Sequence, residues 1–145
     1  MDIQPVNPGR ILVADDEHHI RTVVAAKLRE AGLTVIEARD GEEALRAAQE
    51  ERPDLVVTDL QMPCMSGLEL CLSLKADPRT SAVPALLLTA RGYILDPEQM
   101  ARTNIRRVVG KPFSARSLLA TVRELLADPS GAAGTPGAAP MRDAA

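Results

Sequence analysis

The chain has 145 residues, of which 46% are hydrophobic and 26% charged, and this length suits one domain with a buried core. Its 17 basic and 20 acidic residues leave a formal net charge of −3, which gives no electrostatic reason to expect nucleic acid as the main partner. Tyr93 and Phe113 are the only aromatic residues, which excludes base-stacking platforms and aromatic-lined ligand pockets and requires an aliphatic core.

The two ends of the chain differ in composition from the middle. Residues 1–8 contain two prolines and residues 128–145 are mainly Ala, Gly and Pro, so we expect a disordered lead and tail around a folded domain at 9–127. No stretch resembles a secretory signal or approaches the roughly 20 apolar residues that span a bilayer, so we expect a cytoplasmic protein with no membrane contact. The spacing of Cys64 and Cys71 leaves a disulfide open, although two thiols in a reducing compartment are the simpler expectation.

Short apolar runs recur along the middle of the chain. They are continuous rather than alternating, which is typical of strands covered on both faces. Five such runs are predicted as strands: 11–13, 34–36, 55–57, 85–88 and 108–109.

Between these runs lie stretches with helical spacing. The first is expected to bury one face and to stop at Gly32, and the third, from about Gly67, is expected to lie in the core. The faces predicted to be buried are Ile20, Val23, Val24, Leu28 and Ala31 in the first; Leu68, Cys71, Leu72 and Leu74 in the third; and Leu118, Leu119, Val122, Leu125 and Leu126 in the fifth. The starts are marked by Asp40 with Glu43 for the second, Asp96 with Pro97 and Gln99 for the fourth, and Ser114 for the fifth.

Five strands that alternate with five helices predict an α/β fold, a doubly wound parallel sheet with helices on both faces. In such sheets the chemistry gathers outside the carboxyl ends of the strands. The residues at those ends are Asp15, Asp16 and Glu17 after the first strand, Asp59 at the third, Thr89 and Ala90 at the fourth, and Lys111 and Pro112 at the fifth.

The chemistry of these strand-end residues is consistent with phosphoryl transfer. Two carboxylates about 4 Å apart repel by roughly 4 kcal/mol at an effective dielectric constant of 20, so three of them need a cation. Hard oxygen ligands at an open rim favour Mg²⁺. An ion there would attract phosphate oxygens, which Thr89 and Lys111 could also hold, and one Asp could then attack phosphorus.

The sequence resembles the receiver domains of two-component response regulators over about residues 10–127. Five motifs carry the resemblance: Asp15-Asp16; Thr58-Asp59-Leu60-Gln61-Met62-Pro63; Ser66-Gly67; Thr89-Ala90; and Lys111-Pro112-Phe113. The resemblance implies a flavodoxin-like (βα)5 fold with strand order 2-1-3-4-5. It also implies that Asp59 accepts a phosphoryl group from a phosphohistidine on a sensor histidine kinase or a histidine phosphotransfer protein.

The resemblance further assigns roles around Asp59. Asp16, Asp59 and the backbone carbonyl of Gln61 would ligate Mg²⁺, and Asp15 would hold a water ligand of the ion. Thr89, with its neighbour Ala90, and Lys111 would form the phosphate-binding switch region, and the Lys111–Pro112 bond would be cis. The expected protein is not an enzyme in the ordinary sense but a phosphoprotein that catalyses only its own phosphorylation and dephosphorylation.

Four positions depart from the family pattern. Val108 stands where receivers usually have the Tyr or Phe that reports phosphorylation, so the usual coupling from the site Thr to that ring is not available. Asn104 stands where a glycine often ends the fourth helix, and asparagine tolerates the left-handed backbone. Arg106 and Arg107 occupy places that are commonly acidic and, with Arg102, make this face locally basic, either as a solvated surface or as a docking site for an acidic partner.

No DNA-binding or catalytic segment is visible in the sequence, so output is expected through an effector protein that contacts the fourth helix, fifth strand and fifth helix, without direct DNA binding. Monomer and phosphorylation-induced dimer both stay open. A scaffold that binds partners without phosphorylation is the second hypothesis, favoured by Val108. A haloacid-dehalogenase-type hydrolase is disfavoured because Asp15 and Asp16 are adjacent instead of forming D-x-D, and His18 and His19 are expected to be exposed rather than metal-binding.

Overall fold

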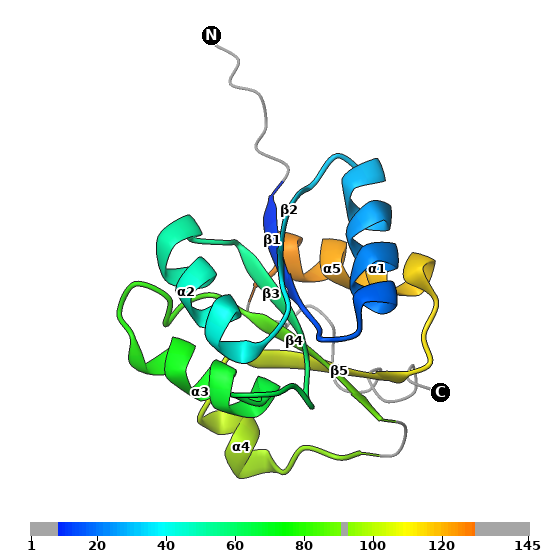
Figure 1. Ribbon diagram of the computed structural model, residues 1–145. Helices are drawn as coiled ribbons and strands as arrows, with labels where there is room; N and C mark the ends of the chain where they lie inside the picture. The colour runs from blue at the N-terminus through cyan, green and yellow to red at the C-terminus, as the bar shows by residue number, and fades with distance from the viewer. Residues whose placement is uncertain (1–8, 91–92, 130–145) are drawn as a thin grey trace, which may run out of the picture.

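The computed structural model describes residues 9–90 and 93–129, in which five strands and five helices alternate (Figure 1). The expected lead at 1–8 and most of the expected tail lie outside the described residues, and the expected domain limits stay a prediction. The strands are β1 (Arg10–Ala14), β2 (Thr34–Ala38), β3 (Leu55–Asp59), β4 (Ala85–Ala90) and β5 (Ile105–Lys111). The helices are α1 (His18–Glu30), α2 (Gly41–Glu51), α3 (Gly67–Ala76), α4 (Pro97–Ala101) and α5 (Ala115–Ala127).

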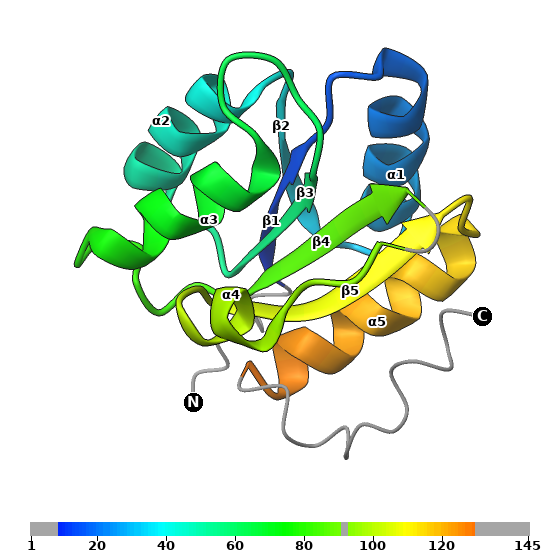
Figure 2. The same ribbon diagram turned by 90° about the horizontal axis from the view of Figure 1, so that it is seen from below.

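The five strands form one parallel sheet in the order β2-β1-β3-β4-β5, which confirms the predicted topology. Figure 2 shows this order across the sheet, with β1 beside β3 near the middle. The chain order reverses at β1, since β2 lies on one side of it and β3 on the other. The carboxyl ends of β1 and β3 are therefore neighbours at the switch point, where open α/β sheets place their sites.

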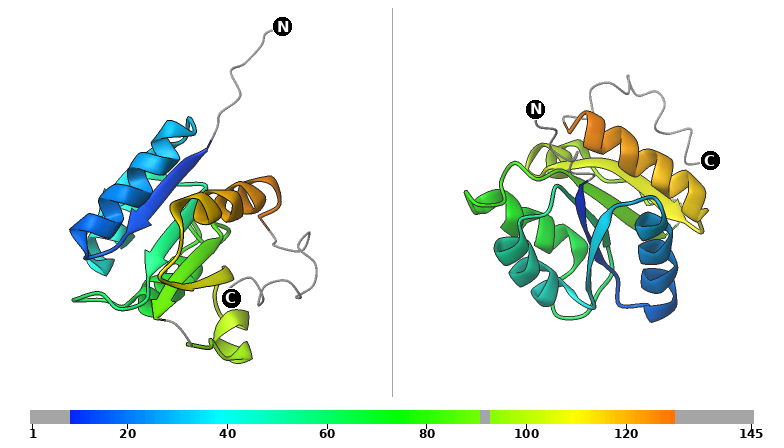
Figure 3. Two further views of the ribbon diagram at one scale, coloured as in Figure 1. Left: turned by 90° about the vertical axis from the view of Figure 1, so that its right-hand side faces the viewer. Right: turned by 90° about the horizontal axis from the view of Figure 1, so that it is seen from above.

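Helices cover both faces of the sheet, with α1 and α5 on one side and α2, α3 and α4 on the other (Figure 3). Alternate residues of each inner strand point to opposite layers, so Ile11 and Val13 pack toward α1 and α5 while Leu12 and Ala14 pack toward α2 and α3. Both layers need apolar partners, which is why the inner strands are continuously apolar.

Side-chain caps fix the starts of four helices. The side chains of Asp40, Ser66, Asp96 and Ser114 each accept a hydrogen bond from the backbone N–H three residues later. At α2 the predicted pairing is only half formed, because the Glu43 carboxylate accepts from the N–H of Arg39 and not from that of Asp40.

Two apolar residues predicted to be buried are exposed. Val23 is 45% exposed and Leu72 is 37% exposed, although each helix buries its neighbouring residues as expected. In α1 the buried residues are Arg21, Val24, Ala25 and Leu28, so Val23 lies outside the buried face. The apolar face of α3 that packs inward is that of Leu70, Cys71 and Leu74.

The fifth strand is longer than the predicted apolar run. It begins at Ile105 and includes Arg106 and Arg107, which are half-buried because β5 is an edge strand with one open side. Asn104, just before it, does not adopt the left-handed backbone. Its buried side-chain amide instead donates to the carbonyls of Ser81 and Val83.

The cysteines are not joined: Cys64 is exposed in the loop after β3, and Cys71 is buried in α3. Burial raises the pKa of the Cys71 thiol to about 12. Within the described ranges no helix has the length and apolarity needed to cross a membrane.

Candidate functional site

Three carboxylates meet where β1 and β3 end. Asp15 and Asp16 follow β1 directly, and Asp59 is the last residue of β3, the strand that pairs with β1. One carboxylate oxygen from each of the three lies within 4.8 Å of the others. Asp15 and Asp59 are buried, whereas Asp16 is exposed. The structure thus brings together the acidic residues that the strand-end argument predicted.

The Asp15 main chain and side chain are both held in place. Its N–H donates to the carbonyl of Ala38 at 3.1 Å, and its Oδ1 accepts from the N–H of Glu17 at 2.9 Å. Its carbonyl accepts a hydrogen bond from the Arg21 guanidinium at 2.8 Å. The direction of the β1–α1 loop is therefore set by contacts on both sides of this residue.

Lys111, at the end of β5, reaches across the cluster. Its ammonium lies 3.0 Å from Oδ1 of Asp59, 3.0 Å from Oε1 of Glu17 and 3.4 Å from Oδ2 of Asp15. Burial alone would lower the pKa of Lys111, but the hydrogen bonds to Asp59 and Glu17 outweigh burial and hold this pKa above its ordinary value. Lys111 is therefore a permanent cation here, and the Lys111–Pro112 bond that follows is cis, as the resemblance implies.

One ammonium does not neutralise the carboxylates. Burial, more than any other cause, raises the pKa values of Asp15 and Asp59 above the ordinary value of 3.8 despite the contacts with Lys111. Converging carboxylate oxygens are hard donors suited to a divalent cation such as Mg²⁺, whose charge would favour their ionised form. The residues present therefore fit the expected ion, with Asp15, Asp16 and Asp59 able to supply oxygens.

The loop after β3 packs tightly against Asp59. The Gly67 N–H donates to the carbonyl of Leu60 at 2.8 Å, and a Cβ atom added to Gly67 would collide with the Asp59 carbonyl oxygen. Only glycine allows α3 to begin this close to the end of β3. Gln61 lies exposed in the same loop, and its backbone carbonyl stays a predicted ligand.

The Thr89 side chain is near the site but is turned away from it. Thr89 is 1% exposed, and its hydroxyl donates to the carbonyl of Ala90 at 3.0 Å. Because Leu88 pairs with Asp59, Thr89 stands one residue beyond the level of Asp59 on the adjacent strand. Val108, where an aromatic was expected from the family, is half-buried and packs into the layer on the α2–α3 side.

The remaining candidates lie outside the cluster. His18 and His19 are exposed in the first turn of α1, as predicted, and His18 Nδ1 lies 3.0 Å from the guanidinium of Arg21. Two of the three basic residues near α4 have protein partners: Arg107 pairs with Glu124 at 2.9 Å, and Arg106 donates to the Asn104 side chain, while Arg102 is exposed.

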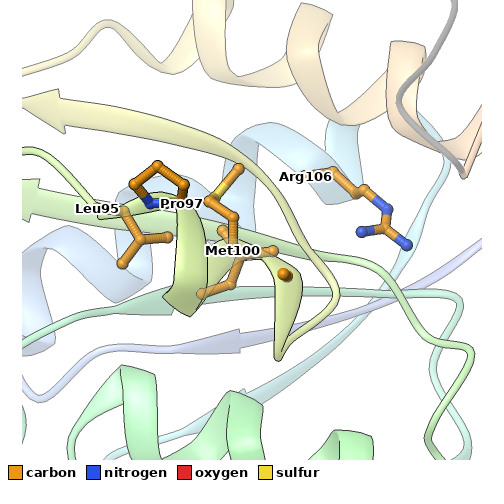
Figure 4. Close-up of a pocket in the computed structure, with 6 residues that line it drawn as sticks. Leu95, Pro97, Met100 and Arg106 are labelled. Carbon is orange, nitrogen blue, oxygen red and sulfur yellow. The ribbon is translucent and has the colours of Figure 1, made fainter.

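A shallow groove lies at α4, away from the carboxylates. Figure 4 shows Leu95, Pro97 and Met100 side by side, with Arg106 at the other end. Ala101 and Ile105 complete its lining.

Sequence reasoning missed three residues that shape the site. Glu17 was noted only as a further acid, yet it contacts Lys111 as closely as Asp59 does. Gly67 was noted as part of a motif without a role. Arg21 gave one available signal, since it stands one helical turn before the apolar Val24 and so shares its face, and that signal alone does not reveal the partner of Arg21.

Comparison with known proteins agrees with this geometry. The model of the response regulator receiver domain family matches residues 11–123. The chain is 38% identical over 117 residues to the alkaline phosphatase synthesis transcriptional regulatory protein PhoP of Bacillus subtilis, covering 81% of this chain and 48% of that protein. The chain thus spans about half the length of such relatives.

Solved structures share the fold. The chemotaxis response regulator CheY4 of Vibrio cholerae superposes with a TM-score of 0.74 at 31% identity, covering 80% of this chain and 97% of that one. The receiver domain of a sensor histidine kinase from Pseudomonas aeruginosa, which has a magnesium ion coordinated in its active-site cleft, gives 0.74 at 27% identity, covering 83% and 98%. By family match, sequence identity and fold, this chain belongs to the response regulator receiver domains.

Proposed function

We propose that this protein is a phosphorylation-dependent switch in which Asp59 accepts a phosphoryl group from a phosphohistidine. In this step a carboxylate oxygen of Asp59 forms a bond to phosphorus while the phosphorus–nitrogen bond of the donor breaks. The nitrogen keeps the electron pair, and the donor leaves as neutral imidazole with its proton on the other ring nitrogen. The observation that carries the proposal is the convergence of Asp15, Asp16 and Asp59 beneath the Lys111 ammonium.

The residues around Asp59 would orient and hold the phosphoryl group. Lys111, already 3.0 Å from Asp59, would hold one phosphoryl oxygen, and Thr89 would turn its hydroxyl from Ala90 toward another. Asp16, Asp59 and the Gln61 carbonyl would hold Mg²⁺, with Asp15 contacting a water ligand. When bound, the ion would neutralise charge on the carboxylates and the phosphoryl oxygens. The magnesium-containing cleft of the Pseudomonas neighbour supports this assignment.

The output would pass to the face formed by α4, β5 and α5. Rotation of Thr89 toward the phosphoryl group would pull the segment that leads to α4 inward. This movement would shift an equilibrium between two forms of the face. The apolar groove at Leu95 and Met100 would be part of the surface that an effector protein contacts. The same proposal places the protein in the cytoplasm, without direct DNA or membrane binding, as a monomer or a phosphorylation-induced dimer. It also includes catalysis of its own dephosphorylation.

Labelling with acetyl phosphate and Mg²⁺ tests the acceptor. We expect the intact protein to gain the mass of one phosphoryl group, and Asp59→Asn to gain none. Asp54→Asn, which changes an exposed carboxylate that follows α2, is the matched control and should be labelled like the parent. Absence of the adduct in the parent, or an adduct that persists in Asp59→Asn, would overturn the proposal.

A scaffold that binds partners without phosphorylation is the second candidate, because Val108 replaces the usual aromatic residue and is packed into the core layer. Partner capture separates the two candidates. If Asp59→Asn and phosphorylated parent retain the same partners to the same extent, the scaffold replaces the switch.

A further inference from the structure

A buried arginine contacts the acidic loop, the segment Asp15, Asp16 and Glu17 between β1 and α1. Arg21, on α1, is 7% exposed, and its guanidinium makes three contacts with different elements. It donates to the carbonyl of Asp15 at 2.8 Å and to Oε1 of Glu37 on β2 at 3.2 Å, and it lies 3.0 Å from Nδ1 of His18. A buried charge is costly unless it is paired. The Arg21 side chain therefore stays where it can keep these three contacts.

The contact with Asp15 bears on the next residue along the chain. The Asp15 carbonyl belongs to the peptide group that leads to Asp16, so fixing this carbonyl fixes the plane from which Asp16 projects. Among the described residues, none makes a hydrogen bond or an ion pair with the Asp16 carboxylate. The position of Asp16 over the cluster is therefore determined by its backbone, and Arg21 holds that backbone.

Glu37 fixes Arg21 in turn. Its second carboxylate oxygen accepts from Arg29 at 3.0 Å, so one carboxylate on β2 orients two arginines of α1. Only Arg21 extends to the acidic loop. Arg29 donates to the carbonyl of Val35 instead.

We propose that Arg21 is a positioning residue for the Mg²⁺ site, which acts through the Asp15 carbonyl to place Asp16. This inference rests on the proposed function, since it concerns the ion expected there. Removing a residue that orients a metal ligand without contacting the metal itself typically lowers the metal affinity about 10- to 100-fold. We expect Arg21→Met to weaken Mg²⁺ binding by about tenfold.

The sign of this effect separates positioning from charge. Arg21 is a cation next to the main chain of the acidic loop, so removing its charge alone would strengthen the binding of another cation there. Loss of position predicts weaker binding, and loss of charge predicts tighter binding. A role limited to stability would lower the unfolding temperature without changing the affinity of the folded protein.

Titration of the full chain with MgCl₂, followed through the backbone amide NMR signals of Asp16 and Glu17, measures this affinity. Arg29→Met is the matched control, because it removes the other arginine on Glu37 and leaves the Asp15 contact intact. We expect Arg29→Met to bind like the parent. Arg21→Lys, which keeps the charge and one donor, should fall between the parent and Arg21→Met. If Arg21→Met does not fold, Arg21→Lys compared with Arg29→Lys gives the same contrast.

Equal or tighter Mg²⁺ binding by the Arg21 variants, beside a parent that binds, would overturn this inference and leave the proposed function standing. An equal loss in the Arg29 variants would also overturn it, since the effect would then belong to Glu37. A parent that binds no Mg²⁺ would overturn the metal site itself and this inference with it.

Discussion

Replacing Asp59 by Asn should make the metal-free protein more stable at neutral pH. With oxygens at most 4.8 Å apart and an effective dielectric constant of 20, repulsion from Asp15 and Asp16 costs Asp59 at least about 3.5 kcal/mol each. Attraction to the Lys111 ammonium at 3.0 Å returns about 5.5 kcal/mol. The two repulsions together exceed this attraction, but solvent weakens the repulsion from the exposed Asp16. We therefore expect Asp59→Asn to raise the free energy of unfolding by about 1 kcal/mol, or roughly 4 °C in Tm.

The pH dependence of this gain follows from the raised pKa of Asp59. A carboxyl group whose pKa is higher in the folded state stabilises the fold fully only below its unfolded value, 3.8. That stability is lost as the pH rises through the folded pKa, because the folded state then gives up a proton that it holds more tightly. The stability difference between Asp59→Asn and the parent should therefore be large at neutral pH and shrink as the pH falls toward 3.8.

Thermal unfolding followed by far-UV circular dichroism, in EDTA and in excess Mg²⁺, measures both effects. Mg²⁺ should raise the Tm of the parent and leave that of Asp59→Asn nearly unchanged. Asp96→Asn is the matched control, because asparagine caps α4 as aspartate does and no carboxylate cluster surrounds it. The reasoning is refuted if Asp59→Asn is less stable than the parent in EDTA at neutral pH, or if Mg²⁺ stabilises both proteins equally.

Two further predictions concern packing around the site. Gly67→Ala should destabilise the fold by more than about 2 kcal/mol in urea unfolding, since its new Cβ would meet the Asp59 carbonyl, whereas Gly32→Ala should cost about 1 kcal/mol for its positive φ alone. Equal losses would contradict this account. Alkylation followed by mass spectrometry should modify the exposed Cys64 in the native protein and Cys71 only after unfolding, because burial raises the pKa of Cys71 to about 12. Rapid native labelling of Cys71 would contradict the packing of α3.

The sheet could be predicted from sequence because its strands are covered on both faces. Continuous apolar runs such as Ile11–Val13 have no polar face, and five of them alternating with helical segments fit a parallel sheet between two helical layers. The same rule fails at β5. An edge strand leaves one side open, so Arg106 and Arg107 fit within it and interrupt the pattern that marks the inner strands.

The acidic cluster could be predicted for a related reason. Parallel strands end at one edge, so the residue after each apolar run points to a shared location, and Asp15, Asp59 and Lys111 all meet there. The contacts of Arg21 and Glu17 follow no such rule. They depend on how α1 packs against β2 and on which carboxylate Lys111 reaches, and both are properties of the folded arrangement.

The charge of the site bears on why the proposed phosphorylation would need both a cation and Lys111. Asp15, Asp16, Glu17 and Asp59 place four carboxylates around the single ammonium of Lys111, so the ionised cluster carries three net negative charges. An incoming phosphoryl group adds further negative charge, and at an effective dielectric constant of 20 each new contact near 4 Å costs about 4 kcal/mol. In the phosphorylation proposed above, a bound divalent ion would leave one net negative charge and so ease the approach of an anionic donor to Asp59. Lys111 alone cannot provide this, because its contacts with Asp59 and Glu17 already occupy it.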